Sequence, residues 1–257
     1  MALVKLDRPE KEIGFITLND PDNLNAMSEE MAQEFKALVA EIAKGDKPRV
    51  LILTGAGRAF SAGGHLDMLE KKTELTREEN YKRMMDFYHA FLSMLTLDIP
   101  VIAAVNGHAI GAGLCIAAAC DIRIVSETAK LGLTFTKLGL HPGMGATYFL
   151  PRIIGQAQAS ELMMTGRVID SAVALKCGLV SRVVAVEDVI EESMKVAREI
   201  ASCGPLSVRQ LTRSLRGDPE ELERALKREA ECQAENYASA EFKEGVRAAI
   251  EKRAPSF

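Results

Sequence analysis

The chain has 257 residues, of which 47% are hydrophobic and 26% are charged, so it is long enough for one large domain or for a domain with a small appendage. Its net charge of -4 argues against a nucleic-acid-binding or anionic-membrane-binding surface, because both need clustered basic residues. The five cysteines include no CxxC pair, which argues against a disulfide framework and a zinc site. We expect a cytoplasmic protein with no export signal, membrane anchor or bound metal.

The first part of the chain predicts alternating strands and helices. Strands are expected at residues 3–6, 13–18, 50–53, 101–104 and 122–125. Helices are expected at residues 28–44, where Ser28 can cap the first turn, and at 77–97 and 112–119. Because strand, crossover and strand recur in order, the pattern predicts a parallel, layered α/β core.

The last third of the chain has a different character. Residues 189–202, 206–215, 219–239 and 240–252 all show the apolar spacing of helices, with no strand predicted between them. We therefore predict two regions: a core at 1–184 and a C-terminal helical region at 185–257.

Two glycine-rich loops follow predicted strands. They are GAGRAFSAGGHL at residues 55–66 and NGHAIGAGL at residues 106–114, and the second opens a helix, where the first N–H groups lack internal partners. Either loop alone is typical of an ordinary glycine-rich turn. Together, at the ends of neighbouring strands, they could aim two N–H donors at one oxygen atom and so form an oxyanion hole.

Six motifs in order resemble those of the crotonase superfamily, the enoyl-CoA hydratase/isomerase family. They are NAMS at 25–28, AFSAGG at 59–64, NG to ACD at 106–121, LGLHPGMGAT at 138–147, LMMTG to GLV at 162–180, and EKR with the last phenylalanine at 251–257. The resemblance spans nearly the whole chain. It implies a crotonase-type α/β spiral of ββα units with a C-terminal helical trimerisation region.

The resemblance also implies the ligand and the assembly. The substrate would be an acyl-CoA thioester, with coenzyme A as part of that substrate and no permanently bound cofactor. The partner would be the chain itself, as a homotrimer or a hexamer formed by a dimer of trimers. Carried over by position, the backbone N–H groups of Gly64 and Ala112 would polarise the thioester oxygen.

The residues implied in substrate or CoA binding are Ala26, Arg58, Ala62, Gly64, Leu66, Phe135 and Tyr148. An acidic protein needs local cations to hold the CoA phosphates, and Arg58 with Lys71 or Lys72 could supply them. The alternative for these basic residues is a solvated surface.

The sequence departs from the family at the positions whose side chains transfer protons. Hydratases of this family use two glutamates, and the matching positions here are Cys115 and Phe135. A thiol with a reference pKa near 8.5 is a poor substitute for a carboxylate, and phenylalanine transfers no proton. The aspartate of many family isomerases and hydrolases is matched by Gly143. Ordinary hydration is therefore doubtful.

The candidate acid or base residues that remain are His65, His141 and Cys115, with Thr134, Thr136 and Tyr148 nearby. For each of the three residues, a structural role without catalysis is the alternative. His65 could be a loop residue facing solvent or CoA, and His141 a hydrogen-bonded turn residue. Cys115, on a helix of small residues, could be a packed and inert thiol.

These observations predict an enzyme, a lyase or isomerase of the enoyl-CoA hydratase/isomerase family that stabilises a thioester enolate in an oxyanion hole. The alternatives are an acyl-CoA thioester hydrolase or decarboxylase of the same fold. A further alternative is a paralogue that binds acyl-CoA without turnover.

Overall fold

The computed structural model describes the backbone of residues 2–257 and all their side chains except that of Leu66. Its larger sheet has six strands in the order β1-β2-β3-β5-β7-β10, and all neighbours are parallel except the pair β1 and β2. These strands are β1 (Val4–Glu10), β2 (Ile13–Leu18), β3 (Val50–Gly55), β5 (Val101–Val105), β7 (Ile122–Ser126) and β10 (Arg182–Val184). The continuous apolar runs in β3 and β5 fit this arrangement, since both strands are buried along their whole length.

A second sheet of four short strands lies beside the first, in the order β4-β6-β8-β9. Its strands are β4 (Ala59–Ser61), β6 (His108–Ile110), β8 (Lys130–Gly132) and β9 (Val168–Asp170). Each of β3, β5 and β7 is followed in sequence by one strand of this sheet, and β4 and β6 are then followed by a helix. The repeated ββα unit confirms the predicted crotonase-type spiral.

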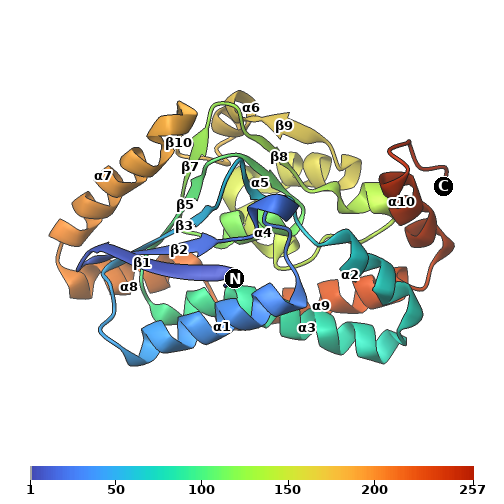
Figure 1. The fold of residues 1–257 in the computed structure, drawn as a ribbon, viewed down its shortest axis with the longest axis horizontal. Coiled ribbons are helices and arrows are strands. Elements are labelled where there is room, and N and C mark those ends of the chain that lie inside the picture. Colours follow the sequence, from blue (N-terminus) through green and yellow to red (C-terminus); the bar gives the residue numbers. More distant parts are fainter. Residues whose placement is uncertain (1) are drawn as a thin grey trace.

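The helices surround the two sheets (Figure 1). They are α1 (Glu29–Lys44), α2 (Leu66–Lys71), α3 (Arg77–Leu92), α4 (Ala112–Ala119), α5 (Ala146–Thr165), α6 (Ser171–Lys176), α7 (Val189–Ser202), α8 (Pro205–Arg216), α9 (Pro219–Asn236) and α10 (Ala240–Ile250). Ser28 caps α1 by accepting from the N–H of Met31, as predicted, and Thr76 with Glu79 forms a capping box on α3. No helix within residues 2–257 is long and apolar enough to cross a bilayer.

Two hydrophobic clusters cover the two faces of the larger sheet. The main cluster joins the sheet to α1, α3 and α4, and a smaller one joins Ile52 and Ile102 to α7. In Figure 1, α7 accordingly lies on one side of the sheet, while α1 and α3 run along another. Burial on both faces stabilises the parallel strands and places their C-terminal loops, including both glycine-rich loops, at one end of the sheet.

The observed helices differ from the expected ones at their ends. The predicted helix at 77–97 is α-helical only to Leu92 and continues as a 3-10 helix (Ser93–Leu97). The expected helices at 219–239 and 240–252 end at Asn236 and Ile250. The second sheet and α5 were not predicted, because strands of three residues show no clear period and α5 is interrupted by Pro151 and the kink at Gly155.

The four C-terminal helices are not equivalent. Residues of α9 and α10, such as Leu226 and Phe242, belong to the main core, and α7 covers the sheet. In contrast, Leu206, Leu211 and Leu215 of α8 are exposed. The division at residue 184 thus marks a change from sheet to helix rather than a boundary between hydrophobic cores, and the oligomeric role of the helical region stays a prediction.

Candidate active site

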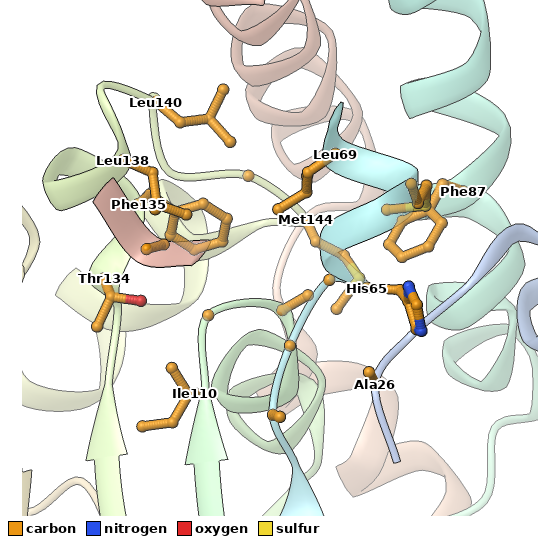
Figure 2. Close-up of a pocket in the computed structure, with 18 of the residues that line it drawn as sticks. Ala26, His65, Leu69, Phe87, Ile110, Thr134, Phe135, Leu138, Leu140 and Met144 are labelled. Carbon is orange, nitrogen blue, oxygen red and sulfur yellow. The ribbon is translucent and has the colours of Figure 1, made fainter. Parts of the chain in front are cut away.

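A pocket of about 600 Å³ lies where the two glycine-rich loops meet α2, α3 and the segment around residues 134–144. Its walls are mostly apolar and include Ile110, Phe135, Leu138, Leu140 and Met144. Figure 2 shows Thr134 and Phe135 on one side of this pocket and Ala26 and His65 on the other. The pocket is large enough for a small acyl group, and its lining favours hydrocarbon.

The first loop is braced by Asn25, a fully buried residue with a positive φ of 53°. Its side-chain nitrogen donates to the carbonyl oxygens of Ala56 and Ala59, both at 2.8 Å, and its side-chain oxygen accepts from the N–H of Asp20 at 2.9 Å. The hydroxyl of Ser61 donates to the carbonyl of Asn25 at 2.8 Å. The predicted NAMS motif therefore acts as a scaffold that fixes the loop from beneath.

The second loop requires glycine at its turn into α4. Gly111 has φ 53° and ψ −122°, a region open only to glycine at low cost. Asn106 joins the two loops, because its side-chain nitrogen donates to the carbonyl of Gly57 at 2.9 Å and its oxygen accepts from the N–H of Gly55 at 3.3 Å. The relative position of the loops is thus fixed by hydrogen bonds.

Two backbone N–H groups in the pocket lining, those of Gly64 and Ala112, have no hydrogen-bond acceptor within residues 2–257. The loops that carry them touch, since a Cβ atom added to Gly63 would lie 2.6 Å from the carbonyl oxygen of Ile110 and 3.5 Å from the amide nitrogen of Ala112. Ala112 also opens α4, whose dipole favours negative charge at this end. The geometry suits the binding of one anionic oxygen.

The structure brings together most of the residues that the resemblance implied. Those in the pocket lining are Ala26, Arg58, Ala62, Gly64, His65, Ala112, Thr134 and Phe135. The side chain of Leu66 lies outside the described part of the structure. Cys115, His141 and Tyr148 are absent from the lining among the described residues.

Cys115 is buried on α4, and its thiol donates to the carbonyl oxygen of Gly143 at 3.2 Å. Burial raises its pKa well above the ordinary thiol value, and the nearby Glu229 adds to this effect. The thiol therefore stays protonated at neutral pH and holds the backbone around Gly143 in place.

His141 is only partly buried, and its ring Nδ1 lies 2.6 Å from the carbonyl oxygen of Pro142. Its backbone N–H donates to Asn236 at 2.8 Å. Burial lowers its pKa, with a smaller contribution from Arg228, while the Pro142 carbonyl opposes the shift. A neutral imidazole that is hydrogen-bonded within its own turn agrees with the alternative in which His141 is a structural turn residue and not an acid or base.

Two of the remaining predicted residues, Tyr148 and Lys72, have hydrogen-bond partners outside the pocket lining. The hydroxyl of Tyr148 donates to the carbonyl of Arg216 at 3.1 Å. Lys72 is buried and bonded to Glu29 at 2.8 Å, and desolvation lowers its pKa despite this partner. The ammonium of Lys72 is therefore already paired with Glu29, whereas Arg58 is exposed at the pocket and Lys71 lines a neighbouring groove with His65.

Three buried polar residues in the pocket lining were not predicted: Tyr88, Gln233 and Tyr237, which together form a polar cluster. They come from α3 and from the end of α9, far from any glycine-rich motif. The sequence offered little sign of a role for these residues, because each lies on or at the end of a helix whose apolar pattern already accounts for its burial. Within the described residues, no group of three or more histidine, cysteine or acidic side chains is arranged to hold a metal ion.

Glu229 of α9 is a buried carboxylate beside this region. It accepts hydrogen bonds from the N–H of Gly145 at 2.7 Å, and from the N–H and hydroxyl of Thr147 at 2.8 and 2.6 Å. Burial raises its pKa from 4.5 to about 7, although these hydrogen bonds act in the opposite direction. Glu229 thus anchors the start of α5 next to the pocket.

Comparison with known proteins decides the family. A sequence profile described as "Enoyl-CoA hydratase/isomerase" matches residues 8–257. The chain belongs to this family. A "Putative enoyl-CoA hydratase" of Thermus thermophilus is 35% identical to this chain over 246 residues, which cover 95% of this chain and 97% of the relative.

Solved structures of the enoyl-CoA hydratase/isomerase family agree with the fold. The crystal structure of an enoyl-CoA hydratase/isomerase from Pseudoalteromonas atlantica has a TM-score of 0.86 at 35% identity, covering 99% of both chains. A monofunctional enoyl-CoA isomerase from Mycobacterium smegmatis has a TM-score of 0.70 at 33% identity, covering 88% of this chain and 100% of that one. The crotonase superfamily predicted from the motifs is therefore confirmed, at the level of an acyl-CoA enzyme family.

Proposed function

We propose that this chain stabilises the enolate form of an acyl-CoA thioester between the N–H groups of Gly64 and Ala112, and that hydration of a simple enoyl-CoA is not its main reaction. The observation that carries the proposal is that two N–H groups in one apolar pocket have no acceptor within the described residues. Donors fixed in a water-poor site stabilise developing negative charge without reorganisation. Coenzyme A enters as part of the substrate.

The positions of Cys115 and Phe135 support the second half of this proposal. The thiol of Cys115 is buried, protonated and bonded to the carbonyl of Gly143, so it is a poor source or acceptor of protons. The ring of Phe135 stands in the pocket wall, where its tip lies 3.9 Å from the position that a Cβ atom on Gly111 would take. An aromatic ring there packs against an acyl chain and excludes water.

A spectrophotometric hydration assay with crotonyl-CoA tests the proposal. Loss of a general acid or base costs a factor of about 10² to 10⁴ in rate per group, so we expect hydration far slower than in enzymes that carry both glutamates. Binding of butyryl-CoA, measured by calorimetry, should persist. A turnover number typical of hydratases would contradict the proposal, and so would the absence of any CoA thioester binding.

The resemblance also implies a homotrimer or a dimer of trimers, and this assembly stays a prediction. The exposed leucines of α8, Leu206, Leu211 and Leu215, support it, because an apolar row of this kind is usually covered in the working assembly.

A further inference from the structure

The turn that enters α5 has an unusual backbone conformation beside the pocket. Met144 has φ 56° and Gly145 has φ 81°, so two consecutive residues are left-handed. Glycine adopts this conformation freely, but methionine does so only at a cost in free energy that neighbouring contacts must offset. The side chain of Met144 is 1% exposed and belongs to the pocket lining, as Figure 2 shows. Contacts that hold this turn therefore hold part of the pocket wall.

Glu229 supplies the contacts that follow the strained residue. Its carboxylate reaches from α9 and is fully buried. It accepts from the N–H of Gly145 at 2.7 Å, and from the N–H and hydroxyl of Thr147 at 2.8 and 2.6 Å. These two N–H groups flank Ala146, the first residue of α5, where backbone donors lack partners within the helix. One side chain thus ties both of its oxygens to the turn directly after Met144.

The first residues of the turn are tied to other walls of the pocket. The carbonyl oxygen of Gly143 accepts from the thiol of Cys115 at 3.2 Å, and the backbone N–H of Met144 donates to the hydroxyl of Tyr88. A Cβ atom on Gly143 would lie 2.3 Å from that hydroxyl, so the turn packs directly against α3. A shift of the turn would therefore move Met144 and disturb the neighbouring wall.

No opposite charge balances the carboxylate of Glu229. The titratable groups near it within the described residues are Tyr88 of α3 and Cys115 of α4, and burial keeps both protonated at neutral pH. From α5 it meets only the polar groups of Gly145 and Thr147. Burial favours the neutral acid and the three donors favour the carboxylate, and together they give a pKa of about 7. The charge of Glu229 therefore changes near neutral pH.

We infer that Glu229 is a positioning residue for this pocket, whose ionised carboxylate holds Met144 in the wall against the acyl group and whose protonated form holds it less firmly. A hydrogen bond to a charged acceptor is about twice as strong as one to a neutral acceptor, so protonation weakens the hold on Gly145 and Thr147 together. The effect on the ligand rests on the proposed function, whereas the coupling between Glu229 and Met144 belongs to the free protein as well.

The first test needs no ligand. The methionine methyl groups are isotope-labelled for NMR, and the signal of Met144 is assigned by its loss in Met144→Leu. We expect this signal to titrate in the wild-type protein with a midpoint near the pKa of Glu229, about 7. It should stay constant over the same range in Glu229→Gln, because the amide does not titrate. The matched control is Glu231→Gln, which removes an exposed carboxylate from the same helix and should leave the titration unchanged.

A second variant keeps the test decisive if Glu229→Gln folds poorly. Thr147→Val preserves the shape of the side chain and the N–H, and it removes the hydroxyl that donates to Glu229. Because that hydroxyl stabilises the ionised form, its loss should raise the midpoint by roughly one pH unit, the equivalent of one hydrogen bond to a charged group. A Met144 signal that does not titrate in the wild-type protein, or an unchanged midpoint in Thr147→Val, would overturn the inference.

The second test measures the effect on the ligand. The affinity for butyryl-CoA is divided by that for CoA itself at each pH, so that ionisation of the CoA phosphates cancels. We expect this ratio to fall about fivefold as pH decreases through the midpoint, as the weakening of one hydrogen bond would give, and to stay low at every pH in Glu229→Gln. A ratio that is independent of pH in the wild-type protein would overturn the inference and leave the proposed function intact. No binding of butyryl-CoA, with the Met144 signal still titrating, would overturn the proposed function and support the coupling of Glu229 to the wall.

Discussion

The proposed oxyanion hole and the polar cluster line one pocket but are built in opposite ways. The hole consists of backbone N–H groups from two loops, and side chains such as Asn25 and Asn106 act only as braces. The cluster consists of side chains from two helices, and Tyr88 and Gln233 are 145 positions apart in the sequence. A site made of backbone depends on which residues permit a conformation, whereas a site made of side chains depends on tertiary packing.

The largest expected effect breaks the backbone side of this comparison. Ala112→Pro removes the donor N–H and keeps a residue that the first turn of a helix tolerates. Losing one oxyanion donor costs on the order of 10² to 10³ in rate, or about 3 to 4 kcal/mol. Steady-state turnover should fall accordingly on any acyl-CoA that the wild-type protein converts.

The matched control is Ala112→Ser, which keeps the N–H and changes only the side chain. It should retain most of the activity, with circular dichroism showing that both variants are equally folded. Equal rates for a well-folded proline variant and the serine control would mean that Ala112 is not an oxyanion donor.

The next effect concerns Glu229, a buried side chain that holds the backbone of Gly145 and Thr147 beside the pocket. The pKa of Glu229 is raised from 4.5 to about 7, so between these values the folded state holds more protons than the unfolded state. Its contribution to stability is therefore complete below pH 4.5 and is lost as pH rises through about 7, an effect of about 3 kcal/mol.

Urea unfolding of the wild-type protein and of Glu229→Gln at several pH values checks this expectation. The free energy of unfolding of the wild-type protein should fall relative to that of the variant as pH rises from 4.5 to 8, because the amide does not titrate. Parallel pH profiles for the two proteins would show that folding does not raise the pKa of this carboxyl.

The smallest expected effect lies at the exposed edge of the pocket. Arg58→Gln removes a surface cation, and a solvent-exposed ion pair contributes about 0 to 1 kcal/mol, so affinity for coenzyme A should fall by no more than about fivefold. The loss should shrink at high salt. Arg209→Gln, in a separate groove, is the control, and an equal loss of affinity in it would remove Arg58 from the CoA site.

The sequence indicated the two glycine-rich loops, and residues of both loops line the pocket. Glycines with unusual dihedral angles, such as Gly63 and Gly111, cannot be replaced without strain, so their spacing is visible in the chain. The strands β3, β5 and β7 and the helices α4 and α7 were likewise predicted nearly residue by residue, because each has a strong apolar pattern or a cap.

The side-chain half could not be predicted for a physical reason. Tyr88 and Gln233 sit on helices whose pattern satisfies burial, and only their packing against Gly143 gives them a shared position. The short strands β4, β6, β8 and β9 could not be predicted for a similar reason. They are defined by their pairing in the second sheet, and their own composition gives no clear signal. Tertiary contacts decide such features, and no local window contains those contacts.

The backbone donors of the proposed oxyanion hole have a property that histidine, cysteine and carboxyl groups lack: an amide keeps its proton at every pH at which the protein is folded. A hole formed by the N–H groups of Gly64 and Ala112, as proposed, would therefore have no titration of its own. Any pH limit on its action would therefore come from the substrate or from groups that stabilise the fold, such as Glu229.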